Sequence, residues 1–114
     1  MAFFFALISA VYVLLYSYST SPLYPYYYGN DAAQFLTIGK GWAEGLLPYR
    51  DLFDHKGPVV FFVNMLGYRL TGSKYGVAAI QICFLFAAIL AICGILRLEE
   101  KSRIYIILCV MIAL

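Results

Sequence analysis

The chain contains 114 residues with a net charge of +2, and 64% of them are hydrophobic while only 12% are charged. Soluble domains are roughly 45–50% apolar and about 25% charged, and a chain this short cannot bury such an excess in its own core. Composition therefore excludes an ordinary soluble domain, and the small net charge does not indicate a nucleic-acid partner.

The first apolar run covers residues 2–18. As a helix it would be roughly 25 Å long, close to the thickness of a hydrocarbon core, which is about 30 Å. No Lys or Arg precedes the run and no clean small-x-small cleavage site accompanies it, although a secretory signal would have both. We therefore expect an uncleaved first membrane span.

A polar interval from residue 19 to residue 56 follows, and it opens with Pro22 and Pro25, which interrupt helix and favour an extended path. Four tyrosines stand at positions 24, 26, 27 and 28. Tyrosines gather at membrane surfaces as an aromatic belt, which is one interpretation. The other is a stacking wall for a sugar, in which Tyr28 would contact the substrate.

A capping-box pattern at residues 31–34, with Asp31 in place of the usual Ser or Thr, predicts the start of a helix. Apolar side chains then recur at helical spacing, at Phe35, Ile38 and Trp42, and polar ones form another face. Gly45 and Pro48 end the pattern. We expect a short amphipathic helix that lies on the membrane.

The next apolar run, residues 58–70, would form a helix of roughly 20 Å, a length more typical of re-entrant or interfacial segments than of spans. Residues 76–98 contain one strongly polar residue, Gln81, before Arg97, and predict a full span. Arg97, near the end of this run, forms a basic cluster with Lys101 and Arg103 after it, which indicates a cytoplasmic end. The N-terminus would then be inside and loop 19–75 on the extracytoplasmic side.

Residues 104–114 are apolar and would extend roughly 16 Å as a helix, about half a membrane. Because a polypeptide rarely ends inside a bilayer, we expect a truncated third span and an N-terminal piece of a larger all-α, polytopic membrane protein. The three cysteines, Cys83, Cys93 and Cys109, lie within apolar runs, which argues against a disulfide framework or a metal site.

The residues able to carry chemistry are concentrated between the two predicted spans. Residues 44–56 hold five charged side chains beside the only histidine, His55; they are Glu44, Arg50, Asp51, Asp54 and Lys56. Charge is costly to hold near a bilayer, so this cluster is a candidate site. A solvated external loop is the alternative interpretation.

The run Asp54-His55-Lys56-Gly57-Pro58 predicts a helix start, with Gly57 as N-cap and Pro58 at the first helical position. The positive end of the helix dipole would then lie beside the charge of Lys56, an arrangement able to bind phosphate. A basic side chain that reaches the membrane surface beside a helix start is the structural alternative.

Asp31 has two candidate roles. As an N-cap, its carboxylate would accept hydrogen bonds from backbone N–H groups. These bonds would keep it ionised and fix its direction. An ionised, oriented carboxylate is also what a base needs in order to deprotonate an acceptor hydroxyl.

Three segments together resemble the first external loop of GT-C glycosyltransferases, in particular the dolichyl-phosphate-mannose–protein mannosyltransferase-like membrane proteins of bacteria. They are residues 30–34, 47–58 and 67–72. The lipid A aminoarabinose transferases look like more distant members. The resemblance covers essentially the whole chain as the family's N-terminal portion, and the Asp-His-Lys-Gly-Pro run is its more specific element.

The resemblance implies many membrane helices, with two further helices parallel to the membrane in the first outer loop. It implies transfer of a sugar, with inversion, from a polyprenyl-phosphate carrier to an extracytoplasmic glycan, lipid or protein acceptor. Asp31 would be the catalytic base. Lys56 would contact the lipid phosphate, although this chain has Lys56-Gly57-Pro58 where the aminoarabinose branch has Lys-Pro-Pro.

The chemistry of this transfer suggests supporting roles for the neighbouring residues. Arg50 or His55 would help Lys56 and the helix end at Pro58 to stabilise charge on the departing phosphate. Asp54 would orient His55 or Lys56, and we rank this role ahead of holding a divalent cation, because a metal site needs more ligands.

A second class of function, transport or scaffolding, would also explain membrane spans with a charged loop between them. Inverted repeats with interrupted helices elsewhere in the protein would favour a transporter. Within the transferase interpretation, we expect these 114 residues alone to be inactive, because the rest of the active site would lie elsewhere in the protein.

Overall fold

The computed structural model describes residues 2–27 and 29–95 together with residues 102 and 105. Four helices make up this part of the chain: α1 (Ala2–Tyr16), α2 (Asn30–Ala43), α3 (Pro58–Thr71) and α4 (Tyr75–Ile95). An isolated bridge between Pro48 and Leu52 is the one strand-like pairing within these residues. The all-α prediction is therefore confirmed for the described residues.

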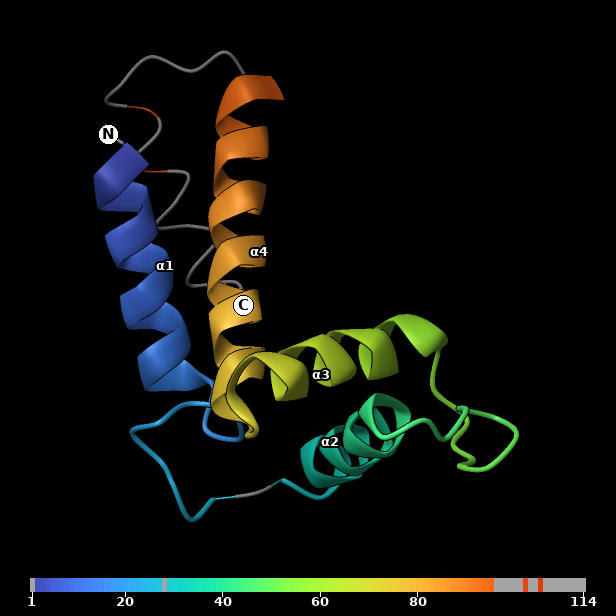
Figure 1. The fold of residues 1–114 in the computed structure, drawn as a ribbon. Helices are drawn as coiled ribbons and strands as arrows, with labels where there is room; N and C mark the ends of the chain where they lie inside the picture. The colour runs from blue at the N-terminus through green and yellow to red at the C-terminus, as the bar shows by residue number, and fades with distance from the viewer. Residues whose placement is uncertain (1, 28, 96–101, 103–104, 106–114) are drawn as a thin grey trace.

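The four helices form two pairs that meet at a corner (Figure 1). Helices α1 and α4 lie side by side and run in opposite directions. Helix α3 leaves the foot of α4 at a steep angle, and α2 packs against α3 on the side away from the body of α4. The loops that carry most of the charged residues therefore lie at one end of the α1–α4 pair.

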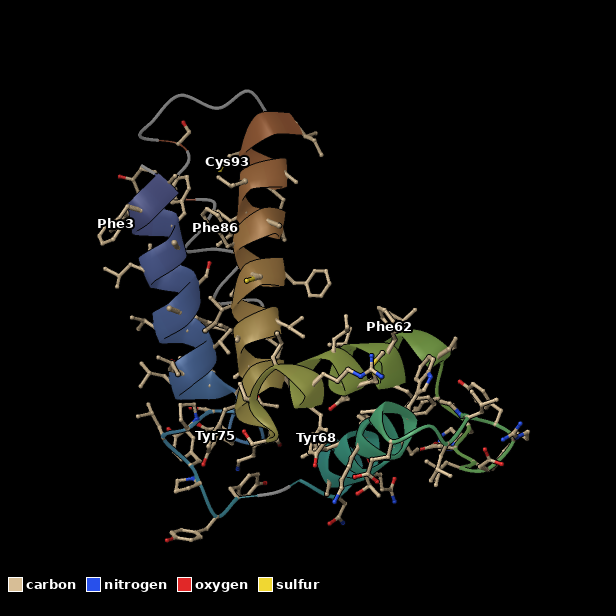
Figure 2. The ribbon with its side chains drawn as sticks, in the orientation of Figure 1. Phe3, Phe62, Tyr68, Tyr75, Phe86 and Cys93 are labelled. Atoms are coloured by element: carbon tan, nitrogen blue, oxygen red, sulfur yellow. The ribbon has the colours of Figure 1, made fainter. Side chains whose placement is uncertain are left out.

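The contact between α1 and α4 is apolar. Phe5 of α1 packs with Ile89 and Cys93 of α4, and Phe86 borders this cluster. Phe86 and Cys93 point toward α1 in Figure 2, whereas Phe3 points away and is 82% exposed. Both helices thus keep large apolar surfaces that are not covered by the described chain.

Helix α4 is the one helix of the described residues that is long and apolar enough to cross a membrane. Its 21 residues correspond to about 31 Å. Helix α1 is also apolar but has only 15 residues. It stops at Tyr16, before the predicted limit of residue 18. Ser17, Thr20 and Ser21 form turns after the helix. The predicted end of the second span, the basic cluster and the third span fall on residues outside the described ones.

Helix α3 begins as the sequence predicts, with Gly57 as N-cap and Pro58 at the first helical position. It ends at Thr71, where Gly72 adopts a left-handed conformation with φ of 67° and donates its N–H to the carbonyl of Tyr68. Glycine favours this conformation because it has no Cβ. The short, separate helix predicted over residues 58–70 is thus confirmed.

Helix α2 differs from its prediction at both its start and its apolar face. Gly29 is the N-cap and Asp31 lies inside the first turn, so the prediction of Asp31 as N-cap is wrong. The apolar stripe packs against α3, with ring-centroid distances of 6.1 Å between Phe35 and Phe61 and 5.9 Å between Trp42 and Phe62. The stripe that we expected to rest on a membrane is therefore used in packing within the chain.

Candidate functional site

A cavity of about 580 Å³ lies where the end of α1 meets the starts of α2 and α4, and we call it the Asp31 cavity. Its polar lining includes Ser17, Thr20, Asn30, Asp31, Asn64 and Gln81. A phenylalanine and three valines supply its apolar lining. Asp31 is exposed, in keeping with a carboxylate that faces an open cavity. Pockets of this size with a few convergent polar groups are typical small-molecule sites.

One wall of the Asp31 cavity is a network between α1 and α4. The amide oxygen of Gln81 accepts from the hydroxyl of Thr20 at 2.7 Å and from that of Ser17 at 3.1 Å. The two hydroxyls are themselves 2.7 Å apart. Gln81, a polar residue in the first half of the predicted span, thus holds the end of α1 against α4.

A second amide lines the cavity from α3. Asn64 is only 7% exposed, and its Nδ2 donates to the carbonyl of Val60 at 2.8 Å. It also lies at the crossing with α2, where a Cβ on Gly39 would come within 2.7 Å of it. An amide at this buried position interrupts the apolar first half of α3, which is costly unless its polar atoms are used.

A second cavity, of about 590 Å³, lies on the adjoining face of α2, and we call it the Asp54 cavity. Gln34 and Thr37 line it from α2, and Phe53, Asp54 and His55 line it from the following loop. The first two turns of α2 therefore separate the carboxylate of Asp31 from the segment that precedes α3.

Asp54 organises the residues before α3. Its side chain is only 9% exposed, and its Oδ1 lies 3.1 Å from Nδ1 of His55. The same oxygen accepts the backbone N–H of Lys56 at 3.3 Å. Asp54 thus contacts the ring of His55 and the backbone of Lys56; its role in orienting either side chain stays a prediction. The side chain of Lys56 is exposed next to the start of α3.

The preceding loop is folded tightly around Asp51. Arg50 donates to both carboxylate oxygens, at 3.0 Å from Nε and 2.8 Å from Nη2, and the N–H of Leu47 donates at 2.9 Å. The hydrogen bond from Arg50, followed by that from Leu47, lowers the pKa of Asp51. The bond to Asp51 raises the pKa of Arg50 in turn. The predicted phosphate ligand Arg50 is thus engaged with its neighbour in the sequence.

Tyr49 fixes the position of this loop against α3. It adopts a positive φ of 67°, and its ring lies 5.8 Å from that of Phe61. Its hydroxyl donates to the carbonyl of Lys56. Tyr49 therefore connects the Arg50–Asp51 pair to the residues that begin α3, and no sequence pattern had singled it out.

Lys74 is a further residue that the sequence did not mark as special. Its ammonium is buried at the start of α4, with 4% of the residue exposed, and donates to the carbonyls of Tyr24 at 2.9 Å and Tyr27 at 2.8 Å. Burial lowers its pKa. It joins the tyrosine segment to the α3–α4 corner; Tyr28 itself lies outside the described residues.

The predicted residues thus fall into separate groups. Asp31 lines one cavity, Asp54 and His55 line the other, and Lys56 follows them at the start of α3. Asn64 and Gln81 are the cavity residues that the sequence reasoning missed as site candidates. Each of the two is an amide within an apolar run of the sequence, a pattern that could have marked both as candidates.

A divalent cation was the secondary role considered for Asp54. Asp54 and His55 supply two candidate ligands, but residues 2–27 and 29–95 contain no group of three or more His, Cys, Asp or Glu that could hold a metal ion. Hard divalent cations need more oxygen donors than this pair offers. The described residues do not fit such a cation, and we derive no step through one.

Comparisons with protein-family models, with curated proteins and with solved structures give no match for this chain.

Proposed function

We propose that this chain contributes the extracytoplasmic active-site region of a multi-pass membrane glycosyltransferase, which moves a sugar from a polyprenyl-phosphate carrier to an acceptor. One observation carries the proposal. The first turns of α2 lie between two cavities, one lined by Asp31 and the other by Asp54 and His55, the residues that precede Lys56. Val77 and Gln81 line the Asp31 cavity from α4, the helix able to cross a membrane.

The proposed base is Asp31. Its carboxylate lies in the first turn of α2 and lines the Asp31 cavity. During transfer an acceptor hydroxyl would lose its proton to Asp31 as its oxygen attacks the anomeric carbon. The bond from that carbon to the carrier phosphate would break at the same time, with a transition state like that of glycoside hydrolysis.

The proposed phosphate site is the start of α3. The first turn of this helix presents backbone N–H groups, and no side chain caps them. Lys56 adds a full charge immediately before it, and Asp54 contacts Lys56 through the backbone. The negative charge that develops on the leaving phosphate would be stabilised there.

The test uses the intact native protein, purified from membranes and placed in proteoliposomes with polyprenyl-phosphate-linked sugars. Release of polyprenyl phosphate is followed for wild type, Asp31→Asn and Lys56→Ala. We expect Asp31→Asn to lower release about 10²–10⁴-fold, as loss of a general base does. Lys56→Ala should cost about 10²-fold through lost charge stabilisation.

Two matched variants control for changes of charge elsewhere on α2. Glu44→Gln removes an exposed acid and Lys40→Ala removes its basic partner, 3.9 Å away. Both should keep wild-type release. Unchanged release in Asp31→Asn and Lys56→Ala would refute the site, and a wild type that releases no carrier from any donor would favour a transport or scaffold function.

A further inference from the structure

We infer that the Asp31 cavity binds the uncharged, hydroxyl-rich ring of a neutral hexose and discriminates against anionic sugars. The inference deepens the proposed function and rests on it for the identity of the ligand as a sugar. It makes a separate claim, because it concerns the charge of the sugar and two amides that have no part in the proposed chemistry.

The lining of the cavity matches the two kinds of surface on a sugar ring. Polar groups come from four elements: the turn after α1, the start of α2, the middle of α3 and the first half of α4. Phe35 and Val63 contribute to the apolar lining. A hexose presents hydroxyls at its rim and C–H groups on its faces, so one ligand can satisfy both kinds of lining.

The two amides are suited to hydroxyl ligands. An amide carries two N–H donors and an acceptor oxygen, and a hydroxyl is both donor and acceptor. Gln81 uses its oxygen to accept from Ser17 and Thr20, and no described contact uses its two N–H donors. Asn64 uses one N–H on the carbonyl of Val60. Each amide therefore has capacity left for a ligand in the cavity that both line.

The charge of the lining points to a neutral ligand. Asp31 is the one charged side chain that lines this cavity among the described residues. A carboxylate in place of the ring's hydroxymethyl group would meet this negative charge with no cation in the described lining to offset it. Like charges brought together at a site reject the wrong partner. A uronic acid should therefore bind at least tenfold more weakly than the hexose of the same configuration.

The experiment measures binding of methyl hexosides and of the matching methyl hexuronides to the intact protein in nanodiscs, by saturation-transfer NMR. We expect the neutral ring to bind and the uronide to bind at least tenfold more weakly. Asn64→Leu, which keeps the branched shape of the side chain but removes the amide, should weaken hexoside binding about tenfold. Gln34→Leu makes the same change on the Asp54 cavity and should leave hexoside binding unaltered.

Asp31→Asn should increase uronide binding, and a misfolded protein could not show such an increase. Removal of the carboxylate should bring uronide binding up toward that of the hexoside. Equal binding of both rings by wild type, or hexoside binding that Asn64→Leu does not change, would overturn the inference.

Competition then identifies the source of the ring. A methyl hexoside that displaces the polyprenyl-linked sugar assigns the cavity to the donor sugar, and one that displaces only the acceptor assigns it to the acceptor; both results support a neutral-hexose site. Selective hexoside binding without any sugar transfer in proteoliposomes would refute the proposed function and leave this cavity assignment standing. Sugar transfer that depends on Asp31, with equal binding of hexoside and uronide, would refute the cavity assignment and leave the proposed function standing.

Discussion

Lys74 shows how a single side chain connects distant parts of this chain. Its ammonium reaches the carbonyls of Tyr24 and Tyr27, which lie about 50 residues away in the sequence. A buried cation is costly unless hydrogen bonds compensate for its lost hydration. The two carbonyls supply that compensation, and they hold the tyrosine segment over the start of α4.

The burial of Lys74 predicts a specific dependence of stability on pH. Because burial lowers its pKa from 10.5, the folded protein loses this proton at a lower pH than the unfolded chain does. Between the lowered pKa and 10.5 the unfolded state binds more protons, so the free energy of unfolding rises with pH in that window. Below the lowered pKa both states are protonated, and this residue contributes no pH dependence.

Thermal unfolding of wild type and Lys74→Met at several pH values checks this expectation. Near neutral pH the variant should be less stable by about 1–3 kcal/mol, because it leaves two carbonyls without their donor. The advantage of wild type should grow as pH rises toward 10.5. Lys40→Met, at an exposed lysine, is the control and should track wild type at every pH. Parallel curves for wild type and Lys74→Met would contradict the predicted shift.

The starts of α3 and α2 show what local sequence patterns can and cannot predict. The Gly57-Pro58 start follows from backbone chemistry that acts within a few residues, and the structure has it as predicted. The Asp31 cap failed because Gly29, two residues earlier, begins the helix from an extended conformation without any side-chain cap. A backbone conformation of this kind leaves no mark in a pattern of capping side chains.

At the scale of elements, the corner between α3 and α4 depends on two glycines. A Cβ on Gly67 would lie 2.6 Å from the backbone nitrogen of Val77, and a Cβ on Gly76 would overlap the carbonyl oxygen of Gly67. Thr71 stabilises the same corner, because its hydroxyl accepts the N–H of Gly76 at 2.9 Å. Close approach of the two helices is possible only without side chains at these positions.

Gly76→Ala should therefore push α3 away from α4 and destabilise the protein by about 1–3 kcal/mol, as overpacking does. Gly94→Ala is the matched control in the same helix, since a Cβ there would meet nothing within 4 Å. It should leave the unfolding temperature unchanged or slightly higher, because Ala favours helix over Gly. Equal effects of the two substitutions in thermal unfolding would argue against the close corner.

The pairing of α2 with α3 illustrates what element-level patterns leave open. The spacing of Phe35, Ile38 and Trp42 predicts an amphipathic helix, and α2 is one. An apolar stripe does not say what covers it, because lipid and another helix offer similar surfaces. The rings of α3 cover it in the structure, and only the positions of Phe61 and Phe62 relative to α2 decided this.

At the scale of the whole molecule, the charged loop and both cavities lie at one end of the α1–α4 pair (Figure 1). The apolar outer surfaces of α1 and α4 lie along the length of the pair. This separation of polar and apolar surface is what a protein needs when one end is in water and its flank is in lipid. It is consistent with loop 19–75 lying outside the bilayer, and its extracytoplasmic side remains part of the proposal.

Cysteine labelling tests that placement in intact cells. The three native cysteines are first replaced by Ala, and single cysteines are introduced by Tyr26→Cys and Phe53→Cys, at positions 95% and 84% exposed. Both should react with a membrane-impermeant maleimide from outside. Phe3→Cys, at the opposite end of α1, should react only after the membrane is opened. The reverse pattern would place the loop in the cytoplasm.

The sequence by itself determined the all-helical character, the separate short helix predicted over residues 58–70, the apolar helix able to cross a membrane and the concentration of charge in the interval before that helix. These properties follow from composition, hydrophobic periodicity and the local chemistry of Gly and Pro, which act over a few residues. Only the tertiary structure decided that Asp31, Asn64 and Gln81 line one cavity and that Lys74 is buried. Such contacts join residues that are 17 to 50 positions apart, and they depend on how closely the helices approach one another, which here is set by glycines at their crossings.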